Sequence, residues 1–178
     1  MKIDFRHITL KDLASLVSGK LKEKGIDAIL VGGACVSIYT ENRYQSFDLD
    51  FISHAAIKEI TSALTEIGFQ KKGMRYFKRK DCPFFIEFVS PPAAIGNEPL
   101  KSEKKLKIKT GTIILLTQTD CVKDRLAAYY HWNDPQALEQ ALMVAKVQRI
   151  NMQEVKRWSE KEGHTDKYQQ FLKRLRKK

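Results

Sequence analysis

The sequence predicts an α/β (α+β) core followed by a C-terminal helical bundle. Up to about residue 118, short apolar runs bounded by glycine or proline alternate with helical patterns, as expected for strands between helices. Beyond that point every pattern is helical, and helices are expected over residues 120–131, 134–148, 151–162 and 165–177. We therefore expect a core over residues 1–118 and a helical region over residues 119–178.

The elements of the core follow from periodicity and from the residues that interrupt it. A helix is expected to begin after Thr9, with Asp12 completing a capping box, and to end at Gly25. The further expected elements are a buried strand over 28–31, a short helix over 34–39, a strand over 47–52, a helix over 55–67, strand-like residues around 75–77, strands over 84–89 and 112–116, and a loop or hairpin over 93–111. The four C-terminal helices have plausible openings at Thr119, Asp134-Pro135, Asn151 and Thr165.

The composition is that of a folded protein. Hydrophobic residues make up 43% of the 178 residues and charged residues 30%, which argues against disorder. The longest uncharged run, residues 28–40, is too short to span a membrane, and the N-terminus lacks a signal-peptide pattern, so we expect a cytoplasmic protein without membrane contact. The three scattered cysteines predict buried free thiols rather than a zinc site or a disulfide framework.

The chain is strongly basic, with 32 Lys and Arg against 21 Asp and Glu and a formal net charge of +11. Such a charge attracts phosphates, whether of nucleotides, of nucleic acid or of an acidic protein. Lysines gather over residues 101–109, and a second basic run occupies residues 173–178. Each run taken alone is most simply a solvated surface, but both together favour an RNA or an acidic partner.

Gly32 and Gly33 end the strand expected over 28–31 and open onto a helix. Glycines there let backbone N–H groups approach a phosphate at a helix N-terminus. In the next strand, Asp48 and Asp50 alternate with apolar residues, so their side chains share one face, roughly 6–7 Å apart at about 3.3 Å per residue. Two carboxylates held that close repel each other unless a cation such as Mg²⁺ binds between them.

Glu87 is a third carboxylate, in the middle of the apolar strand expected over 84–89. An Asp-x-Asp pair alone also fits an ordinary solvated strand face. The preceding glycine turn and the later strand carboxylate together favour a functional site.

This combination resembles the nucleotidyltransferase superfamily with a DNA polymerase β-like catalytic core, closest to its branch of AbiEii-type toxins and minimal nucleotidyltransferases. The matching residues are Gly32-Gly33, Asp48-x-Asp50 and Glu87. The sequence departs from the family pattern in having Gly33 where many members have Ser, in the 14 residues between Gly33 and Asp48, and in having Glu87 rather than Asp.

The resemblance extends to residues outside the two acidic strands. Arg43 and Ser46 match an Arg and a Ser or Thr that often precede the first acidic strand. Asp120-x-x-Lys123 resembles a helical motif whose Lys meets nucleotide phosphates. Asp120 is equally well explained as a helix cap, and Arg125, a further candidate, also fits an ordinary exposed helical turn.

The resemblance implies a polymerase β-like mixed sheet flanked by helices and a Mg²⁺-dependent transfer of NMP from an NTP to an acceptor hydroxyl. Asp48, Asp50 and Glu87 would then be the catalytic residues and would hold two Mg²⁺ ions. The nucleotide and its phosphates would be bound by Gly32, Gly33, Arg43, Ser46 and Lys123.

Several functional alternatives stay open. The acceptor could be RNA, such as a tRNA 3′ end in a toxin-like role, or a protein side chain or small molecule. The fold could also serve as a catalytically inactive nucleotide- or nucleic-acid-binding module, or as the toxin of a pair with an antitoxin-like protein partner. The run Tyr129-Tyr130-His131-Trp132 could stack a base, although packing between the two halves is its plainer interpretation.

Overall fold

The computed structural model describes residues 3–90 and 92–177. Its centre is a mixed seven-stranded sheet in the order β3-β4-β5-β2-β1-β9-β8, so the predicted fold class is confirmed. The strands are β1 (Ile29–Val31), β2 (Asp48–Ile52), β3 (Gln70–Lys71), β4 (Tyr76–Lys78), β5 (Phe85–Val89), β8 (Glu103–Ile108) and β9 (Gly111–Leu116), and β6 (Ala94–Ile95) pairs with β7 (Glu98–Pro99) in a separate hairpin. The helices are α1 (Leu10–Glu23), α2 (Gly32–Tyr39), α3 (Ile57–Glu66), α4 (Gln118–Trp132), α5 (Pro135–Val147), α6 (Met152–Lys161) and α7 (Thr165–Arg176).

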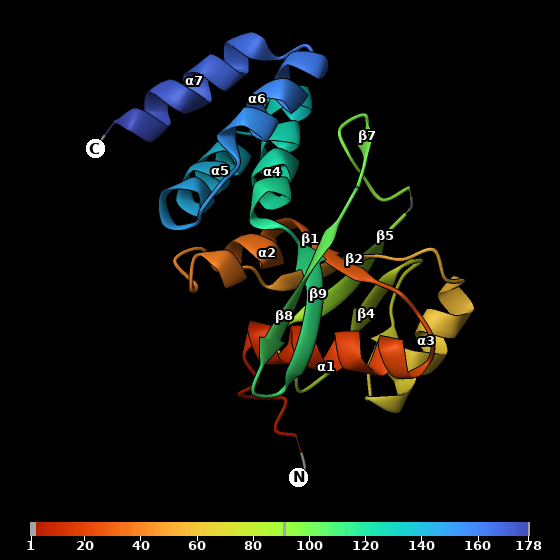
Figure 1. Ribbon diagram of the computed structural model, residues 1–178. Helices are drawn as coiled ribbons and strands as arrows, with labels where there is room; N and C mark the ends of the chain where they lie inside the picture. The colour runs from red at the N-terminus through yellow and green to blue at the C-terminus, as the bar shows by residue number, and fades with distance from the viewer. Residues whose placement is uncertain (1–2, 91, 178) are drawn as a thin grey trace.

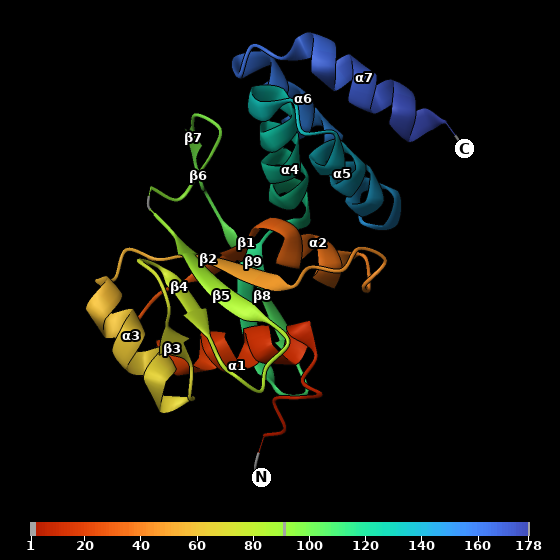
Figure 2. The same ribbon diagram turned by 180° about the vertical axis from the view of Figure 1, so that it is seen from behind.

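The helices lie on two sides of the sheet. In both ribbon views α1 and α3 lie on the side nearer the N-terminus, whereas α2 and the four helices α4–α7 lie on the opposite side (Figures 1 and 2). The β6–β7 hairpin rises from the sheet beside α4. The hairpin and the helices α2 and α4 therefore lie on the same side of the sheet.

Alternation along β2 and β5 separates a core face from a polar face. Leu49 and Phe51 of β2 and Phe88 of β5 are at most 1% exposed, and the two phenylalanine rings stack with centroids 5.8 Å apart. Because side chains alternate along a strand, the polar residues of β2 and β5 point to the opposite face. Burial of this apolar face thus fixes which way the carboxylates of the two strands point.

Capping residues set the helix starts, with two corrections to the sequence prediction. Thr9 caps α1 as expected, its side chain accepting a hydrogen bond from the N–H of Asp12. At α4 the cap is Thr117 rather than Thr119, because the Thr117 hydroxyl accepts from the Asp120 N–H at 3.1 Å and α4 begins two residues earlier than expected. At α7, Thr165 is already helical and His164 occupies the cap position without a side-chain hydrogen bond.

The segment over residues 93–111, expected to be a loop or hairpin, contains the β6–β7 hairpin and also the edge strand β8. β8 pairs antiparallel with β9 along its whole length. The sequence of β8, Glu-Lys-Lys-Leu-Lys-Ile, does not predict a strand, because lysine is depleted from strands in general. Lysine is nevertheless favoured on exposed edge strands, where it discourages pairing with another chain. The basic run over residues 101–109 is therefore largely the edge of the sheet.

Two further sequence expectations concern cysteines and membranes. Cys35, Cys82 and Cys121 are all free and buried, as predicted. Within residues 3–90 and 92–177, none of the helices combines the length and apolarity needed to cross a membrane.

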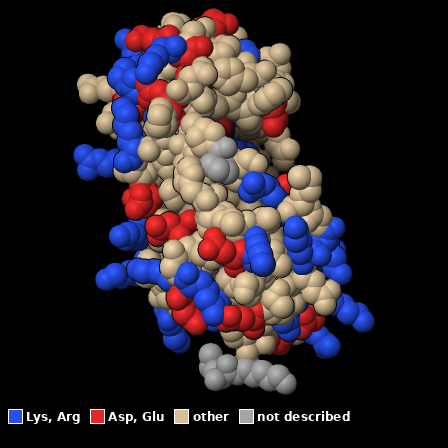
Figure 3. Space-filling model, turned by 90° about the vertical axis from the view of Figure 1, so that its right-hand side faces the viewer, with Lys and Arg blue, Asp and Glu red and all other residues tan. Residues whose placement is uncertain are grey.

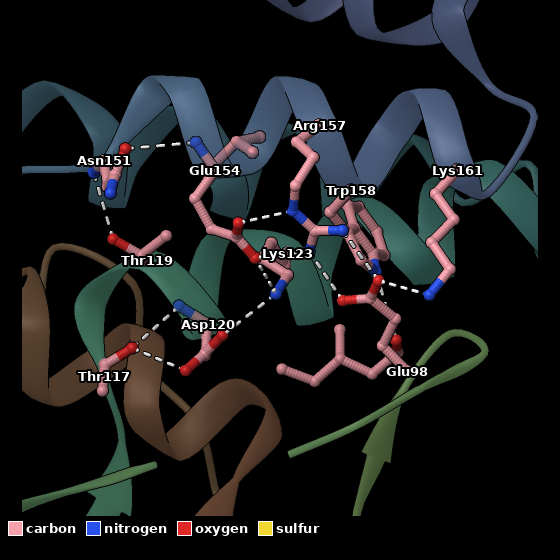
Figure 4. A network of polar contacts seen from close by, with 12 residues as sticks. Glu98, Thr117, Thr119, Asp120, Lys123, Asn151, Glu154, Arg157, Trp158 and Lys161 are labelled. Carbon is pink, nitrogen blue, oxygen red and sulfur yellow. Dashed lines mark hydrogen bonds and ion pairs between the residues drawn. The ribbon is translucent and has the colours of Figure 1, made fainter. Parts of the chain in front are cut away.

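Ion pairs to the buried side chain of Glu98 join the β6–β7 hairpin to α6. The Glu98 carboxylate, 5% exposed, accepts two hydrogen bonds from the Arg157 guanidinium, at 2.9 and 2.8 Å, and lies 2.9 Å from the Lys161 ammonium (Figure 4). The indole N–H of Trp158 donates to the Ile95 carbonyl of the same hairpin at 3.2 Å. These contacts fix the position of the hairpin against the helices.

We expect Glu98→Gln to lower the Tm by several degrees at neutral pH. Arg157 and then Lys161 hold the pKa of Glu98 well below its usual range, so the ionised carboxylate stabilises the fold above the ordinary glutamate pKa, and this contribution is lost as the pH falls below it. Thermal unfolding at pH 7 and at pH 3 would show a large difference from wild type at pH 7 and a smaller one at pH 3. Glu160→Gln is the matched control, since Glu160 is half exposed and 3.7 Å from Lys156. Equal Tm shifts in the two variants would show that the ion pairs of Glu98 stabilise the fold no more than an exposed ion pair does.

Candidate functional site

The turn from β1 into α2 brings Gly32 against Asp50. Gly32 has φ +68, a conformation that L side chains rarely adopt, and a Cβ placed there would lie 2.6 Å from Asp50 Oδ2. β1 and β2 pair antiparallel with Val31 opposite Asp50, which puts this carboxylate next to the N-terminus of α2. The absence of a side chain at Gly32 therefore leaves room for the Asp50 carboxylate. It also leaves the backbone N–H groups at the start of α2 open to an anion, as anion binding at a helix N-terminus requires.

The three strand carboxylates lie on adjacent strands. β2 and β5 run parallel, with Asp50 directly opposite Glu87. Burial first, and then the negative charges of Asp48 and Glu87, raise the pKa of Asp50 to about 7. Glu87 is exposed, whereas Asp48 and Asp50 are partly buried. The cluster thus holds carboxylates whose negative charges oppose one another.

Ser46 and Tyr44 form one side of the site. The Ser46 hydroxyl donates to Asp48 Oδ1, and the Ser46 N–H donates to the Ser37 hydroxyl at 2.9 Å, so Ser46 ties Asp48 to α2. The Tyr44 ring lies 3.4 Å from the position that a Cβ on Gly33 would take. Burial first, and then the negative charge of Asp48, raise the pKa of the Tyr44 phenol. No sequence pattern pointed to Tyr44, apart from its position between Arg43 and Ser46.

Of the two basic candidates on α4, Arg125 rather than Lys123 has a charge that reaches the acidic cluster. The charge of Arg125 lowers the pKa of Asp50 and that of its neighbour Asp124 raises it, so both side chains of α4 act on the cluster. Arg125 Nε donates to Asp124 at 2.9 Å and Arg125 Nη1 donates to Gln140 of α5 at 3.3 Å. A partly exposed guanidinium held in this way can meet a substrate phosphate.

Lys123 lies in a different environment. Its side chain is 7% exposed, and its ammonium pairs with Asp120 at 3.3 Å and with Glu154 of α6 at 3.1 Å (Figure 4). Positions 123 and 125 are about 200° apart around a helix, at roughly 100° per residue, so Lys123 and Arg125 point in nearly opposite directions. The predicted Asp120-x-x-Lys123 motif therefore joins α4 to α6, and Asp120 also accepts a hydrogen bond from the capping Thr117.

Arg43 is exposed in the loop between α2 and β2, which contains Glu41 and Asn42 at positive φ. Its backbone N–H donates to the Thr40 carbonyl at 3.1 Å. The loop places Arg43 close in sequence to Ser46 but leaves its side chain on the surface.

The donor set suits a cation that completes its coordination with substrate. In the described part of the chain, no three His, Cys, Asp or Glu side chains stand close enough to form a complete metal site. Asp48 and Asp50 nevertheless supply two carboxylates on one face, and the charge of Asp48 adds to the effect of burial in raising the pKa of Asp50. Mg²⁺ is commonly bound by one or two carboxylates together with substrate phosphates and water, so these residues fit that ion.

Charge on the surface is mixed. On the face shown in Figure 3, basic and acidic side chains are interspersed over the sheet and its helices. The exposed lysines of the 101–109 run are Lys101, Lys105, Lys107 and Lys109, on and beside the edge strand β8. The net charge of +11 is thus spread over several surfaces.

Comparisons with solved structures show which known fold this one resembles. An antigenic nucleotidyltransferase-like protein from Paracoccidioides brasiliensis is 15% identical and matches 76% of this chain and 74% of its own, with a TM-score of 0.58. The antibiotic-resistance factor ANT(2'')-Ia is 10% identical and matches 76% of this chain and 82% of its own, with a TM-score of 0.50. No family model and no curated protein sequence matches the chain. The chain therefore has a nucleotidyltransferase-like fold.

Proposed function

We propose that the protein is a Mg²⁺-dependent nucleotidyltransferase that transfers NMP from an NTP to an acceptor hydroxyl. The observation that carries this proposal is the close approach of Asp50 to the Gly32 turn on a face shared with Asp48 and Glu87. Carboxylates and a phosphate-binding helix N-terminus are the two groups that a metal–triphosphate substrate requires side by side. The nucleotidyltransferase-like fold supports this function.

The residues divide the work by their positions. Backbone N–H groups of Gly32 and Gly33 donate hydrogen bonds to phosphate oxygens, and Arg125 neutralises part of the triphosphate charge. The acceptor oxygen forms a bond to the α-phosphorus while the bond from that phosphorus to the bridging oxygen breaks and pyrophosphate leaves. The acceptor proton passes to a carboxylate, for which the exposed Glu87 is the candidate. When bound at Asp48 and Asp50, Mg²⁺ supplies Lewis-acid charge neutralisation at the phosphates.

We further propose RNA as the acceptor. The support is the exposed lysines of β8 and the exposed basic residues at the end of α7, which suit a phosphate backbone. A tRNA 3′ end, a toxin-like role and an antitoxin-like protein partner remain predictions from the resemblance to AbiEii-type proteins.

Transfer of label from each of four α-³²P NTPs to total RNA, in the presence of Mg²⁺, tests the proposal directly. We expect labelled RNA on a denaturing gel with wild type and none with Asp48→Asn. Label on the protein itself would keep the transferase but replace RNA by a protein acceptor. If NTP and Mg²⁺ together neither bind nor raise the Tm, the transferase proposal is wrong.

A further inference from the structure

A groove runs along α4 beside the tip of the β6–β7 hairpin. It has a volume of about 450 Å³ and is lined by Gly96, Asn97, Asp124, Arg125, Ala127, Ala128, His131 and Trp132. The α4 residues recur at the spacing of one helix face, so the groove runs lengthwise along that helix. Its lower end is marked by Asp124 and Arg125, whose charges act on Asp50. The groove therefore begins at side chains whose charges reach the candidate site.

The two sides of the groove differ in character. Ala127 and Ala128 contribute only small side chains from α4, and the tip of the β6–β7 hairpin at Gly96 and Asn97 forms the other side. The hairpin tip is held in place because the backbone N–H and the side-chain amide of Asn97 both donate to Glu162, at 2.9 Å each. A groove with a fixed wall and small side chains between its ends can accept a planar group.

Trp132 lies at the upper end of the groove, seven residues beyond Arg125 on the same helix face. Its side chain is 81% exposed, whereas the neighbouring Tyr130 is buried and stacks on Trp158. An exposed indole beside a groove has no packing role in the core and offers a surface for stacking. Seven residues of helix extend about 10 Å, which is similar to the length of a nucleotide from its base to its β-phosphate.

We propose that this groove binds the nucleoside of the donor NTP, with the base stacked on Trp132 and the phosphates directed toward Arg125 and the Gly32 turn. The inference rests on the proposed function and adds the place of the base and the residue that holds it. Stacking on an indole is tolerant of base identity, so Trp132 sets affinity for the nucleoside more than a preference among bases.

Intrinsic fluorescence tests this proposal before any acceptor is known. The chain contains two tryptophans, and Trp158 is fully buried, so quenching by a bound base should come from Trp132. We expect ATP with Mg²⁺ to quench the emission of wild type, and Trp132→Ala to abolish the quenching and weaken ATP binding about 5- to 100-fold. Trp132→Phe should restore most of the affinity because a phenyl ring still stacks. Trp132→Ala should leave the binding of inorganic triphosphate unchanged.

The outcomes separate this inference from the proposed function. If neither ATP nor triphosphate binds wild type, the proposed function fails first. If ATP binds wild type and Trp132→Ala equally well, the donor base does not lie on Trp132 and the inference is wrong. A higher KM for the RNA acceptor with unchanged ATP binding would likewise overturn it, by assigning the groove to an acceptor base.

Discussion

Replacing Asp50 by Asn is expected to abolish nucleotidyl transfer and at the same time to make the protein more stable. The first effect follows because Asn cannot supply a carboxylate to the metal–triphosphate substrate, and we expect the turnover to fall at least about 10³-fold, as when preorganised charge at a reacting centre is removed. The second effect follows because burial first, and then the charges of Asp48 and Glu87, disfavour the ionised form of Asp50 more than the charge of Arg125 favours it. Opposite signs in one variant are characteristic of a functional residue that strains its surroundings.

The pH dependence of the stability gain follows from the raised pKa. Folding raises the pKa of Asp50 from its usual 3.8 to about 7, so ionised Asp50 costs the folded state free energy that protonated Asp50 does not. Asp50→Asn should match wild type below pH 4, gain on it as the pH rises to 7, and keep a constant advantage above that. At about 1.4 kcal/mol per pKa unit the advantage reaches about 4 kcal/mol at most.

Urea unfolding of the metal-free protein at pH 4, 6 and 8 measures this difference. Asp27→Asn is the matched control, because it removes the same charge from an exposed residue just before the neighbouring strand β1. A stability gain that is equal at pH 4 and pH 8, or equal in the control, would show that the carboxylate cluster does not strain the fold. Loss of stability in Asp50→Asn at pH 8 would contradict the charge argument altogether.

The order of strands and helices could be predicted because local patterns carry it. Gly25 and Gly68 follow the first and third helices, and the alternation of Asp48, Leu49 and Asp50 predicts a strand with one acidic face. Leu49 is buried on the face of the sheet toward α1 and α3. The side chains of Asp48 and Asp50, which alternate with it, therefore point to the opposite face. β8 could not be predicted in the same way, since an edge strand rich in lysine has no apolar run to mark it.

The partners of individual side chains were beyond the sequence. The proximity of Glu87 to Asp50 depends on the register of two parallel strands that are 33 residues apart in the chain, and nothing local fixes that register. The choice between Lys123 and Arg125 depends on the rotation of α4, which is set by packing against α5 and α6 through Gln140 and Glu154. A motif names residue types and spacing, but it does not say which way the helix faces.

Gly32→Ala is expected to impair the site strongly although it adds only one methyl group. An alanine at φ +68 is strained by about 1–2 kcal/mol, and its Cβ at 2.6 Å from Asp50 Oδ2 forces the carboxylate to move. Displacement of a catalytic group by about 1 Å can cost on the order of 10²-fold in rate, so we expect a loss of that size in turnover. The Kd for Mg²⁺ in the presence of NTP should rise with it.

Gly33→Ala is the control that distinguishes the general effect of replacing a glycine in this turn from the specific effect of a side chain that displaces Asp50. Gly33 is the next residue in the same helix turn, without positive φ, and its Cβ would meet Ser46 Oγ at 3.1 Å rather than a carboxylate. Since alanine is favoured over glycine within a helix by about 1 kcal/mol, this contact and the helix gain oppose each other and stability should change by less than that amount. Steady-state kinetics and thermal unfolding of both variants measure the contrast. If Gly33→Ala loses as much turnover as Gly32→Ala, the turn is sensitive to any side chain and the specific approach of Gly32 to Asp50 is not what positions the carboxylate.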